Sequence, residues 1–387
     1  MSINNILDRG VNQILPSKKE LEKLMNKRKI TLYQGFDPTA DSLHIGHFIG
    51  LRKLAQFQEL GHKVIFLIGD FTAMIGDPTD KSATRQKLSP GEIRKNFKNY
   101  KKQASKLVRF EGENKAEVKF NSEWLGKFNF EEVLELSSNF TVQQMLERDF
   151  FQTRLKKQKP IYLHEFLYPL MQGYDSVAMN VDLEVGGNDQ LFNMMAGRTL
   201  LKSAKNKQKF VLTMKLLTDA NGKKMGKTED NAIFLSDSPS DIYGKIMAMP
   251  DTFLPQAVEL LTDLQLDFYK KHNALETKKR IALEVVEQIY DKPKAQEAQS
   301  YFENAFQKGN LPEKIPVIKI EERSLNIIDL IDKSDLISSR SQIKRLVKQG
   351  AISINGEKIT AIDSEISVSK NLIIKIGKKD YVKYKKS

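Results

Sequence analysis

The chain contains no cysteine, a single tryptophan and only five histidines in 387 residues. The absence of cysteine excludes disulfides, thiolate zinc sites and cysteine nucleophiles, and it suits a reducing compartment. The longest strongly apolar run, 64–68, is far shorter than the ~20 residues of a membrane helix. The first residues lack a cationic segment followed by an apolar stretch, so no secretory signal is visible. We therefore expect a cytoplasmic protein with no membrane partner.

Positive charge, in contrast, is in excess: 62 Lys and Arg stand against 49 Asp and Glu, a net charge of +13. Residues 325–387 hold 13 of these basic residues and 7 of the acidic ones, so nearly half of the excess lies in about a sixth of the chain. Such clustering favours a nucleic-acid surface over general solubility. A lysine-rich composition without a polyanionic partner remains the alternative.

Residues 30–69 have the pattern of a strand, a loop, a helix and a second strand. Apolar residues recur at helical spacing over 44–60, with Ser42 as the expected N-cap, and 63–69 is typical of a buried strand. A βαβ unit of this kind implies a parallel sheet, whose ligands bind beyond the carboxyl ends of the strands. The loop 34–43 is therefore where we expect the chemistry.

Two histidines, His44 and His47, stand three residues apart at the start of the predicted helix, so their rings share one face. They allow three interpretations: a metal pair, packed or surface histidines, or a clamp for a polyphosphate at a helix N-terminus. A metal pair lacks a third ligand of matching character nearby in the sequence. The complete His-Ile-Gly-His sequence of 44–47 favours the polyphosphate clamp.

A second motif, Asn-Gly-Lys-Lys-Met-Gly-Lys-Thr, occupies 221–228. It is one residue too short between its glycines for a P-loop, and no strand leads directly into it. The alternative is a loop in which Lys224 and Lys227 neutralise phosphates. Taken alone, a solvated charge run would be the default interpretation, but the position some 180 residues after His-Ile-Gly-His strengthens the phosphate hypothesis.

The rest of the chain divides by composition. Residues 90–151 are expected to be helical and polar, 161–210 to be mixed α/β, and 236–308 to be all-helical. A linker follows, and beyond it a compact unit is predicted: a basic helix at 339–349 closed by Gly350, a strand at 351–354, and a hairpin turn at 355–356 leading into 357–359.

In their order along the chain, these motifs closely resemble those of the bacterial tyrosyl-tRNA synthetases, which are class I aminoacyl-tRNA synthetases. The matching segments are Tyr-Gln-Gly-Phe-Asp-Pro-Thr at 33–39, His-Ile-Gly-His at 44–47, Ile-Gly-Asp-Pro at 75–78, Tyr-Pro-Leu-Met-Gln-Gly-Tyr-Asp at 168–175, Gly-Gly-Asn-Asp-Gln at 186–190 and Lys-Met-Gly-Lys-Thr at 224–228. The last differs from the family pattern Lys-Met-Ser-Lys-Ser but keeps both lysines.

The resemblance implies an α/β fold with a Rossmann-like, parallel-sheet catalytic domain over 1–232, carrying a helical insertion at about 90–160. An all-helical, anticodon-side domain would follow at 233–310, then a linker at 311–324. A small α+β RNA-binding domain of the S-four type would occupy 325–387.

The resemblance also implies site residues. Those for ATP would be Gly35, Asp37, Thr39, His44, His47, Gly187, Asp189, Lys224 and Lys227, with Lys81 and Arg85 joining His44, His47 and the two loop lysines as catalytic residues. Those for tyrosine would be Tyr33, Asp77, Tyr168, Gln172, Asp175 and Gln190, and those for RNA would be Arg340, Lys344, Arg345 and Lys348. Tyr168, Gln172 and Asp175 stand at i, i+4 and i+7, which places them on one face if 168–175 is helical.

The implied reaction activates tyrosine with ATP to tyrosyl-adenylate and then transfers the tyrosyl group to tRNA-Tyr. Magnesium would accompany ATP, with no tightly bound protein metal and no DNA partner, and the family suggests a homodimer. A tryptophanyl-tRNA synthetase is the nearest alternative, although Tyr33, Asp175 and the C-terminal unit argue against it. A small-molecule nucleotidyltransferase would leave that unit without a purpose, and a catalytically inactive RNA-binding protein is disfavoured by the intact motifs.

Overall fold

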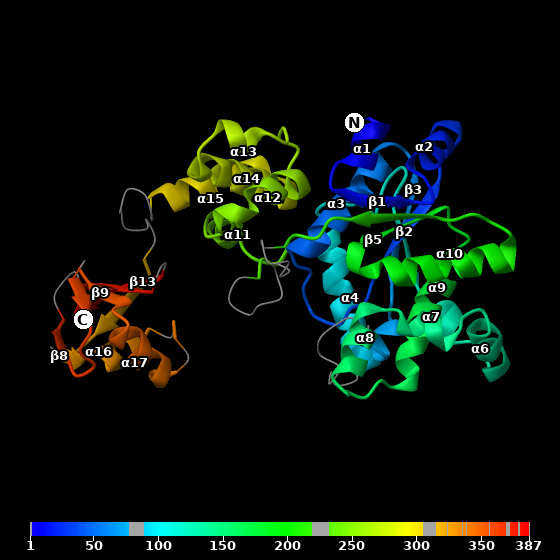
Figure 1. Cartoon of the computed structure of the whole chain (residues 1–387). Helices are drawn as coiled ribbons and strands as arrows, with labels where there is room; N and C mark the ends of the chain where they lie inside the picture. The colour runs from blue at the N-terminus through cyan, green and yellow to red at the C-terminus, as the bar shows by residue number, and fades with distance from the viewer. Residues whose placement is uncertain are drawn as a thin grey trace. The chain divides into compact units, whose positions relative to one another are not determined.

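The computed structural model describes residues 2–76, 89–218, 232–304, 315–322, 324–334, 336–337, 339–355, 357–368, 372–377 and 380–386 (Figure 1). The chain forms two compact units, Met1–Gln296 and Glu297–Ser387. Within the described ranges, none of the helices combines the length and apolar character needed to cross a bilayer.

The first unit is built on a six-stranded sheet with the order β1-β6-β5-β2-β3-β4. The neighbours from β6 to β4 are parallel, whereas β1 runs antiparallel to β6 at one edge. The strands are β1 (Val11–Leu15), β2 (Thr31–Phe36), β3 (Lys63–Ile68), β4 (Glu117–Phe120), β5 (Leu183–Gly187) and β6 (Phe210–Met214). The predicted Rossmann-like parallel sheet is thus confirmed.

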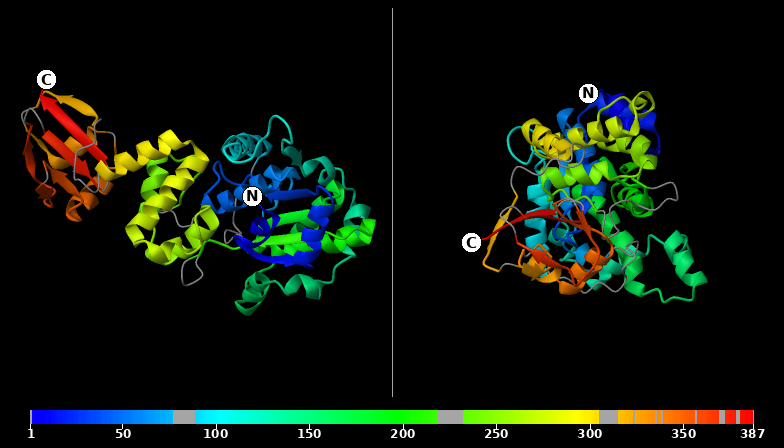
Figure 2. Two further views of the ribbon diagram at one scale, coloured as in Figure 1. Left: turned by 90° about the horizontal axis from the view of Figure 1, so that it is seen from above. Right: turned by 90° about the vertical axis from the view of Figure 1, so that its left-hand side faces the viewer.

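Helices pack around this sheet (Figures 1 and 2). They are α1 (Ile3–Asp8), α2 (Lys18–Lys27), α3 (Ile45–Glu59), α4 (Pro90–Ala104), α5 (Ser122–Leu125), α6 (Phe130–Ser137), α7 (Val142–Leu146), α8 (Asp149–Lys156), α9 (Leu167–Met179) and α10 (Leu191–Lys205), with short 3-10 turns η1 (Thr72–Met74), η2 (Leu163–Phe166) and η3 (Asn188–Gln190). The predicted strand–helix–strand unit is β2-α3-β3, and its two strands pair in parallel.

The expectation that residues 90–151 are helical is wrong at one point, because Glu117–Phe120 forms β4 and extends the sheet beside β3. This strand is only four residues long and carries Glu117 and Lys119 among its apolar residues. A strand at the sheet edge does not need the continuous apolar run of a central strand, so it leaves little trace in the sequence.

The helical region predicted after residue 236 is confirmed in its described part. It contains α11 (Pro239–Met247), α12 (Leu254–Leu261), α13 (Phe268–Lys271), α14 (Ala274–Ile289) and α15 (Lys292–Phe302), with η4 (Asp251–Phe253) before α12. Arg52 of α3 connects these helices to the sheet domain, since its guanidinium donates to Gln288 and pairs with Asp263.

The second unit is a small α+β body. A five-stranded sheet of order β10-β9-β12-β13-β7 and a two-stranded sheet of β11 and β8 accompany two helices. The elements are β7 (Val317–Ile320), β8 (Ser324–Asn326), α16 (Ile327–Asp332), α17 (Arg340–Lys348), β9 (Ile352–Ile354), β10 (Glu357–Ile359), β11 (Glu365–Ser367), β12 (Leu372–Ile376) and β13 (Asp380–Lys386). The predicted basic helix and the β9–β10 hairpin are both present, and Gly350 has the positive φ of +64° expected after a helix end.

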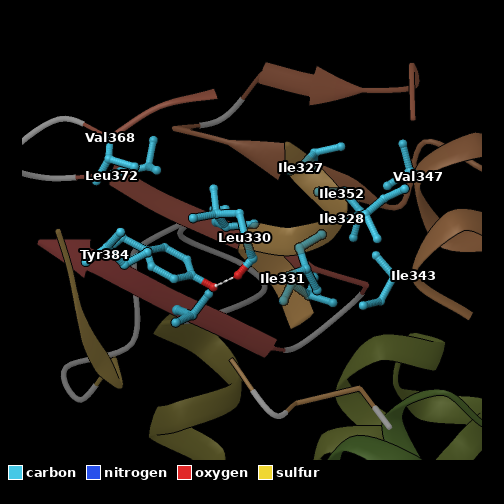
Figure 3. Packing of buried hydrophobic residues seen from close by; sticks show 14 residues of the cluster. Ile327, Ile328, Leu330, Ile331, Ile343, Val347, Ile352, Val368, Leu372 and Tyr384 are labelled. Atoms are coloured by element: carbon cyan, nitrogen blue, oxygen red, sulfur yellow. Dashed lines mark hydrogen bonds between the residues drawn. The ribbon is translucent and has the colours of Figure 1, made fainter. Parts of the chain in front are cut away.

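This unit has its own apolar core (Figure 3). Ile327 and Ile331 of α16 meet Ile343 and Val347 of α17 beneath the larger sheet. The hydroxyl of Tyr384 on β13 donates to the backbone carbonyl of Leu330, which satisfies the one polar group of a fully buried ring. A separate core is consistent with an independently folded appendage.

Candidate active site

A cavity of about 290 Å³ opens between the carboxyl ends of β2 and β5, where the order of the strands in the sheet reverses. At such a switch point the connections leave toward opposite sides of the sheet and create a crevice. The lining includes every predicted site residue of the first unit that the structure describes: Tyr33, Gly35, Asp37, Thr39, His44, His47, Tyr168, Gln172, Asp175, Gly187, Asp189 and Gln190. Five further predicted residues, Asp77, Lys81, Arg85, Lys224 and Lys227, lie outside the described residues.

One part of the cavity is a polar cluster inside the protein. Tyr33 is fully buried and Asp175 is 2% exposed. The Asp175 carboxylate accepts a hydrogen bond from the indole Nε1 of Trp124 at 2.8 Å and a longer one, 3.5 Å, from Asn121. Burial raises the pKa of both Tyr33 and Asp175 well above their ordinary values. A buried acceptor near a buried phenol suits a ligand with a hydroxyl group, which would donate to the carboxylate and accept from the phenol.

Helix α9 presents Tyr168, Gln172 and Asp175 on one face, as their spacing predicts. The Tyr168 hydroxyl donates to Asp37 at 2.8 Å, and Asp37 also accepts from Thr72 at 2.8 Å. Gln172 bonds to Glu184 of β5 and to Asn193 of α10, so each side chain of this face has a partner within the protein. Their positions are set before any ligand arrives.

Beneath this cluster lies a set of residues that the sequence did not single out. Lys209, at the entry to β6, is fully buried, and its ammonium pairs with Glu184 of β5 and donates to Ser176 of α9 at 2.8 Å. The Ser176 hydroxyl in turn lies 2.8 Å from that of Tyr33. A signal for Glu184 did exist, because a lone carboxylate inside the apolar run of β5 needs a buried partner. Nothing in the sequence identified Lys209 as that partner.

The two histidines meet at the start of α3, with ring centroids 4.0 Å apart. The expected N-cap, Ser42, is wrong: His44 is the N-cap, and its Nδ1 accepts from Gly46 N at 3.0 Å, while His47 Nδ1 accepts from His44 N at 3.2 Å. Ser42 instead bonds to Gln103 and Ser236. An imidazole reaches back to the helix amides as a serine hydroxyl would, so residue preference alone could not choose between them.

This capping fixes what the helix end offers to an anion. Because both Nδ1 atoms accept backbone N–H groups, the neutral rings carry their proton on Nε2. The first amides of the helix already donate to protein acceptors: Ile45 N to Ile233 O and His47 N to His44 O, both at 2.8 Å. The backbone amides at this helix end are therefore already engaged within the protein.

The start of α3 is also joined to the segment that follows the lysine motif. Ile45 N donates to Ile233 O, and Leu235 N donates to Leu43 O at 2.8 Å, which forms a short antiparallel bridge. Gln103 of α4 supports the same turn, since its amide oxygen accepts from Ser42 Oγ at 3.0 Å and from Leu43 N at 2.8 Å. The start of α3, at the histidine end of the cavity, is thus hydrogen-bonded both to residues 233–235 and to Gln103 of α4.

Among the described residues, no three His, Asp or Glu side chains gather as metal ligands would. The predicted RNA-binding residues all lie on α17 of the second unit. Lys344, Arg345 and Lys348 are exposed, whereas the guanidinium of Arg340 pairs with Asp329 and Asp332 of α16.

The comparison with known proteins agrees with this geometry. Residues 25–307 match the family model for class I tRNA synthetases (W and Y), and residues 307–384 match that of the tyrosine–tRNA ligase SYY-like C-terminal domain. Tyrosine–tRNA ligase 2 of Clostridium acetobutylicum is 41% identical over 98% of this chain and 97% of its own, and tyrosine–tRNA ligase of Aquifex aeolicus is 38% identical over 97% and 96%. The chain belongs to the tyrosine–tRNA ligase family.

A protein of known structure has the same fold as this chain. The crystal structure of a C-terminally truncated mitochondrial tyrosyl-tRNA synthetase from Coccidioides posadasii superposes with a TM-score of 0.63 at 27% identity, covering 77% of this chain and 90% of that one. Membership places the protein among the class I aminoacyl-tRNA synthetases, which use ATP as substrate. The tyrosine–tRNA ligase assignment is supported over the tryptophan enzyme and over an inactive RNA-binding protein.

Proposed function

We propose that the cavity holds tyrosine with its phenol at the buried cluster and ATP with its phosphates at the histidine end, and that the chain joins tyrosine to tRNA-Tyr in two steps. The observation that carries this proposal is that the carboxylate of Asp175, 2% exposed, and the fully buried phenol of Tyr33 line the same cavity. A pocket for phenylalanine, whose ring has no polar group, would have no use for a buried carboxylate of this kind. The hydroxyl of tyrosine gives Asp175 a donor and Tyr33 a partner.

For the amino group of tyrosine, we assign Tyr168, Gln172 and Asp77. Tyr168 Oη donates its proton to Asp37, so toward a ligand this oxygen acts as a hydrogen-bond acceptor. An ammonium group is donor-only, and a phenol oxygen and an amide oxygen are acceptors that match it. Gln190 lines the same cavity and would lie along the bound substrate.

For ATP, we assign the phosphates to Thr39, His44 and His47, and the nucleoside side to Gly35, Asp37, Gly187 and Asp189. The Nε2–H groups of the two histidines match phosphate oxygens as donors. Lys81, Arg85, Lys224 and Lys227 would stabilise the departing pyrophosphate. The short bridge between α3 and residues 233–235 supports a role for the two loop lysines, because it ties residues that follow their motif in the sequence to the histidine end of the cavity.

In the first step, the tyrosine carboxylate attacks the α-phosphorus of ATP, and pyrophosphate leaves with the electron pair of the broken bond. A carboxylate is already a nucleophile at pH 7, so alignment and cationic donors account for the catalysis and no general base is needed. Magnesium would enter with ATP, held mainly by phosphate oxygens and water. In the second step, a terminal ribose hydroxyl of tRNA-Tyr attacks the activated carbonyl and AMP leaves.

For tRNA binding, we propose the second unit, as an RNA-binding domain of the S-four type, with the helices of 233–310 on the anticodon side. Lys344, Arg345 and Lys348 form an exposed basic face on α17. On the sheet, Lys375 and Lys383 lie on the face opposite the core, because their strand neighbours Ile374, Ile376, Val382 and Tyr384 are buried. Phosphate contacts from such lysines give affinity that falls with salt. The charge of Arg340 is offset by Asp329 and Asp332, so we expect it to contribute less to RNA binding than the three exposed basic residues.

We also propose a homodimer that works in the cytoplasm. Half of the exposed large apolar residues in the described chain fall within 130–163: Phe130, Leu134, Val142, Leu155, Tyr162 and Leu163. Leu163 and Phe130 are 81% and 76% exposed. A concentration of apolar side chains of this kind is typical of a surface that a second subunit covers.

The test is ATP–pyrophosphate exchange with each of the twenty amino acids in turn, using the full-length chain with magnesium and ATP. We expect exchange with tyrosine and none above background with tryptophan. Exchange driven by tryptophan and not by tyrosine would overturn the specificity, and tRNA binding without any exchange would show an inactive relative.

A further inference from the structure

Lys209 is the only fully buried ammonium among the lysines whose side chains the structure describes. It lies one layer below the cavity and does not line it. Its pKa is lowered by burial, while the facing carboxylate of Glu184 acts in the opposite direction. Removing a lysine from water costs several kcal/mol unless charge and hydrogen bonds compensate, so such a residue is a costly way to fill a core.

The partners of Lys209 connect it to three of the six predicted tyrosine-binding residues: Tyr33, Gln172 and Gln190. On one side its ammonium donates to Ser176, whose hydroxyl contacts that of Tyr33 at 2.8 Å. On the other side it pairs with one oxygen of Glu184, and the other oxygen accepts from Gln172 at 3.1 Å.

The second branch continues beyond Gln172. The amide nitrogen of Asn193 donates both to Gln172 Oε1 at 2.9 Å and to Gln190 Oε1 at 3.0 Å. The carboxylate of Glu184 can only accept, which sets the direction of the bond from Gln172 and then of the bond from Asn193. Gln172, which donates to Glu184 and accepts from Asn193, is thereby fixed in one amide orientation.

The packing of α9 against α10 is shaped around Lys209. A Cβ added to Gly197 of α10 would lie 2.5 Å from Lys209 Nζ and 2.7 Å from Ser176 Oγ. No side chain fits there without displacing the ammonium, which has no solvent to move into. Glycine at this position keeps the contact between Lys209 and Ser176 open.

We propose that Lys209 is a specificity-determining positioning residue: its ammonium holds Ser176 and Glu184 so that Tyr33 and Gln172 are set to receive tyrosine rather than phenylalanine. The inference rests on the proposed function of the cavity and deepens it. Lys209 touches no substrate and acts through its two partners.

The reason is competition for the Tyr33 proton. Glu184 lies close enough to the Tyr33 hydroxyl to accept its proton in a hydrogen bond, and so does Ser176. The ammonium offsets the charge of Glu184, which makes that carboxylate a weaker acceptor for the Tyr33 proton. It also donates to Ser176, and this leaves the serine proton for Tyr33 Oη. The Tyr33 proton is then available to the hydroxyl of the substrate. Without the ammonium, Glu184 takes the Tyr33 proton, and the advantage of a substrate hydroxyl is reduced.

The test compares kcat/KM for tyrosine and for phenylalanine in ATP–pyrophosphate exchange, with the full-length chain. The variants are Lys209→Met, which keeps the length without the charge, Lys209→Met with Glu184→Gln, which removes the whole pair, and Ser176→Ala. Lys207→Met is the matched control, because Lys207 lies two residues away and pairs with Asp182 and Asn180 O outside the cavity. Melting temperatures are recorded for all.

We expect Lys209→Met and Ser176→Ala to lower the preference for tyrosine by about ten- to a hundredfold, the scale of a lost hydrogen bond to a charged partner. The double variant should recover melting temperature, because no unpaired carboxylate is left buried. Its preference for tyrosine should stay low. The control should keep the wild-type preference.

A double variant that regains both melting temperature and preference would reduce Lys209 to a structural residue and overturn the proposal. So would an unchanged preference in folded Lys209→Met. If Lys209→Met does not fold, the double variant and Ser176→Ala decide. A wild-type chain without tyrosine-dependent exchange would overturn the proposed function itself, which is a separate outcome.

Discussion

Acid should destabilise the first unit through one histidine. His62 is 1% exposed, and its Nδ1 accepts a hydrogen bond from Ile30 N at 3.2 Å. Burial, and next to it the positive charge of Lys29, lowers the pKa of His62 from 6.5 to about 4. The folded protein thus keeps this ring neutral at a pH where the unfolded chain binds a proton.

The sign and size follow from this difference. Well above pH 6.5, His62 is neutral in both the folded and the unfolded protein, so it has no effect on how stability depends on pH. As the pH drops from 6.5 toward 4, the free energy of unfolding falls, because only the unfolded chain binds the proton. The full pKa difference corresponds to about 3.4 kcal/mol, of which about 2 kcal/mol is already lost between pH 7.5 and pH 5.0. His62→Gln removes the titration and keeps an acceptor oxygen for the Ile30 amide.

The assay is urea unfolding of wild type and His62→Gln at pH 7.5 and pH 5.0, followed by the fluorescence of Trp124. This is the only tryptophan of the chain, and it lies in the first unit. Relative to wild type, the variant should gain about 2 kcal/mol in free energy of unfolding when the pH falls to 5.0. Because both proteins share every other titrating group, the contributions of those groups to the free energy of unfolding cancel in the comparison. An equal difference at both pH values would refute the reasoning.

Four other predictions concern function. Asp175→Asn should lower kcat/KM for tyrosine by about ten- to a hundredfold while the KM for ATP changes little, measured by pyrophosphate exchange; unchanged tyrosine affinity would remove Asp175 from the pocket. Gln103→Leu should raise the KM for ATP and not that for tyrosine, because it removes the acceptor that holds the turn before the histidines, and an equal rise in both would contradict this. Leu163→Asp should shift the protein toward monomer in sedimentation velocity; an unchanged sedimentation coefficient would place the subunit contact elsewhere. Lys344→Gln combined with Lys348→Gln should weaken tRNA binding and lower its salt slope by about one to two, whereas a fall in affinity with the slope intact would argue against phosphate contacts.

The sequence was most informative where function and local spacing coincide. The i, i+4, i+7 spacing of Tyr168, Gln172 and Asp175 placed them together on α9, and the strand–helix–strand pattern located the loop that leads to the histidines. Both are short-range patterns, which depend on helix and strand periodicity alone. The roles assigned to these residues remain predictions.

Residues that act through distant partners could not be predicted in the same way. Lys209 and Ser176 stand 33 positions apart, and only the folded chain brings them together. The short strand β4 was missed because an edge strand carries a weak pattern, and His44 took the cap position from Ser42 because Gln103, from another helix, bonds to that serine. In each case, tertiary contacts overrode a local preference.

The bridge between α3 and residues 233–235 has a consequence for how this enzyme is best dissected. Its bonds join main-chain atoms of Leu43, Ile45, Ile233 and Leu235, so truncating any of these side chains leaves the bonds in place. Alanine scanning would therefore overlook the link between the start of α3 and residues 233–235. Proline at Leu235, which lacks the N–H that donates to Leu43, would expose it. The link is thus made by the backbone, so side-chain substitutions at these four positions leave its hydrogen bonds in place.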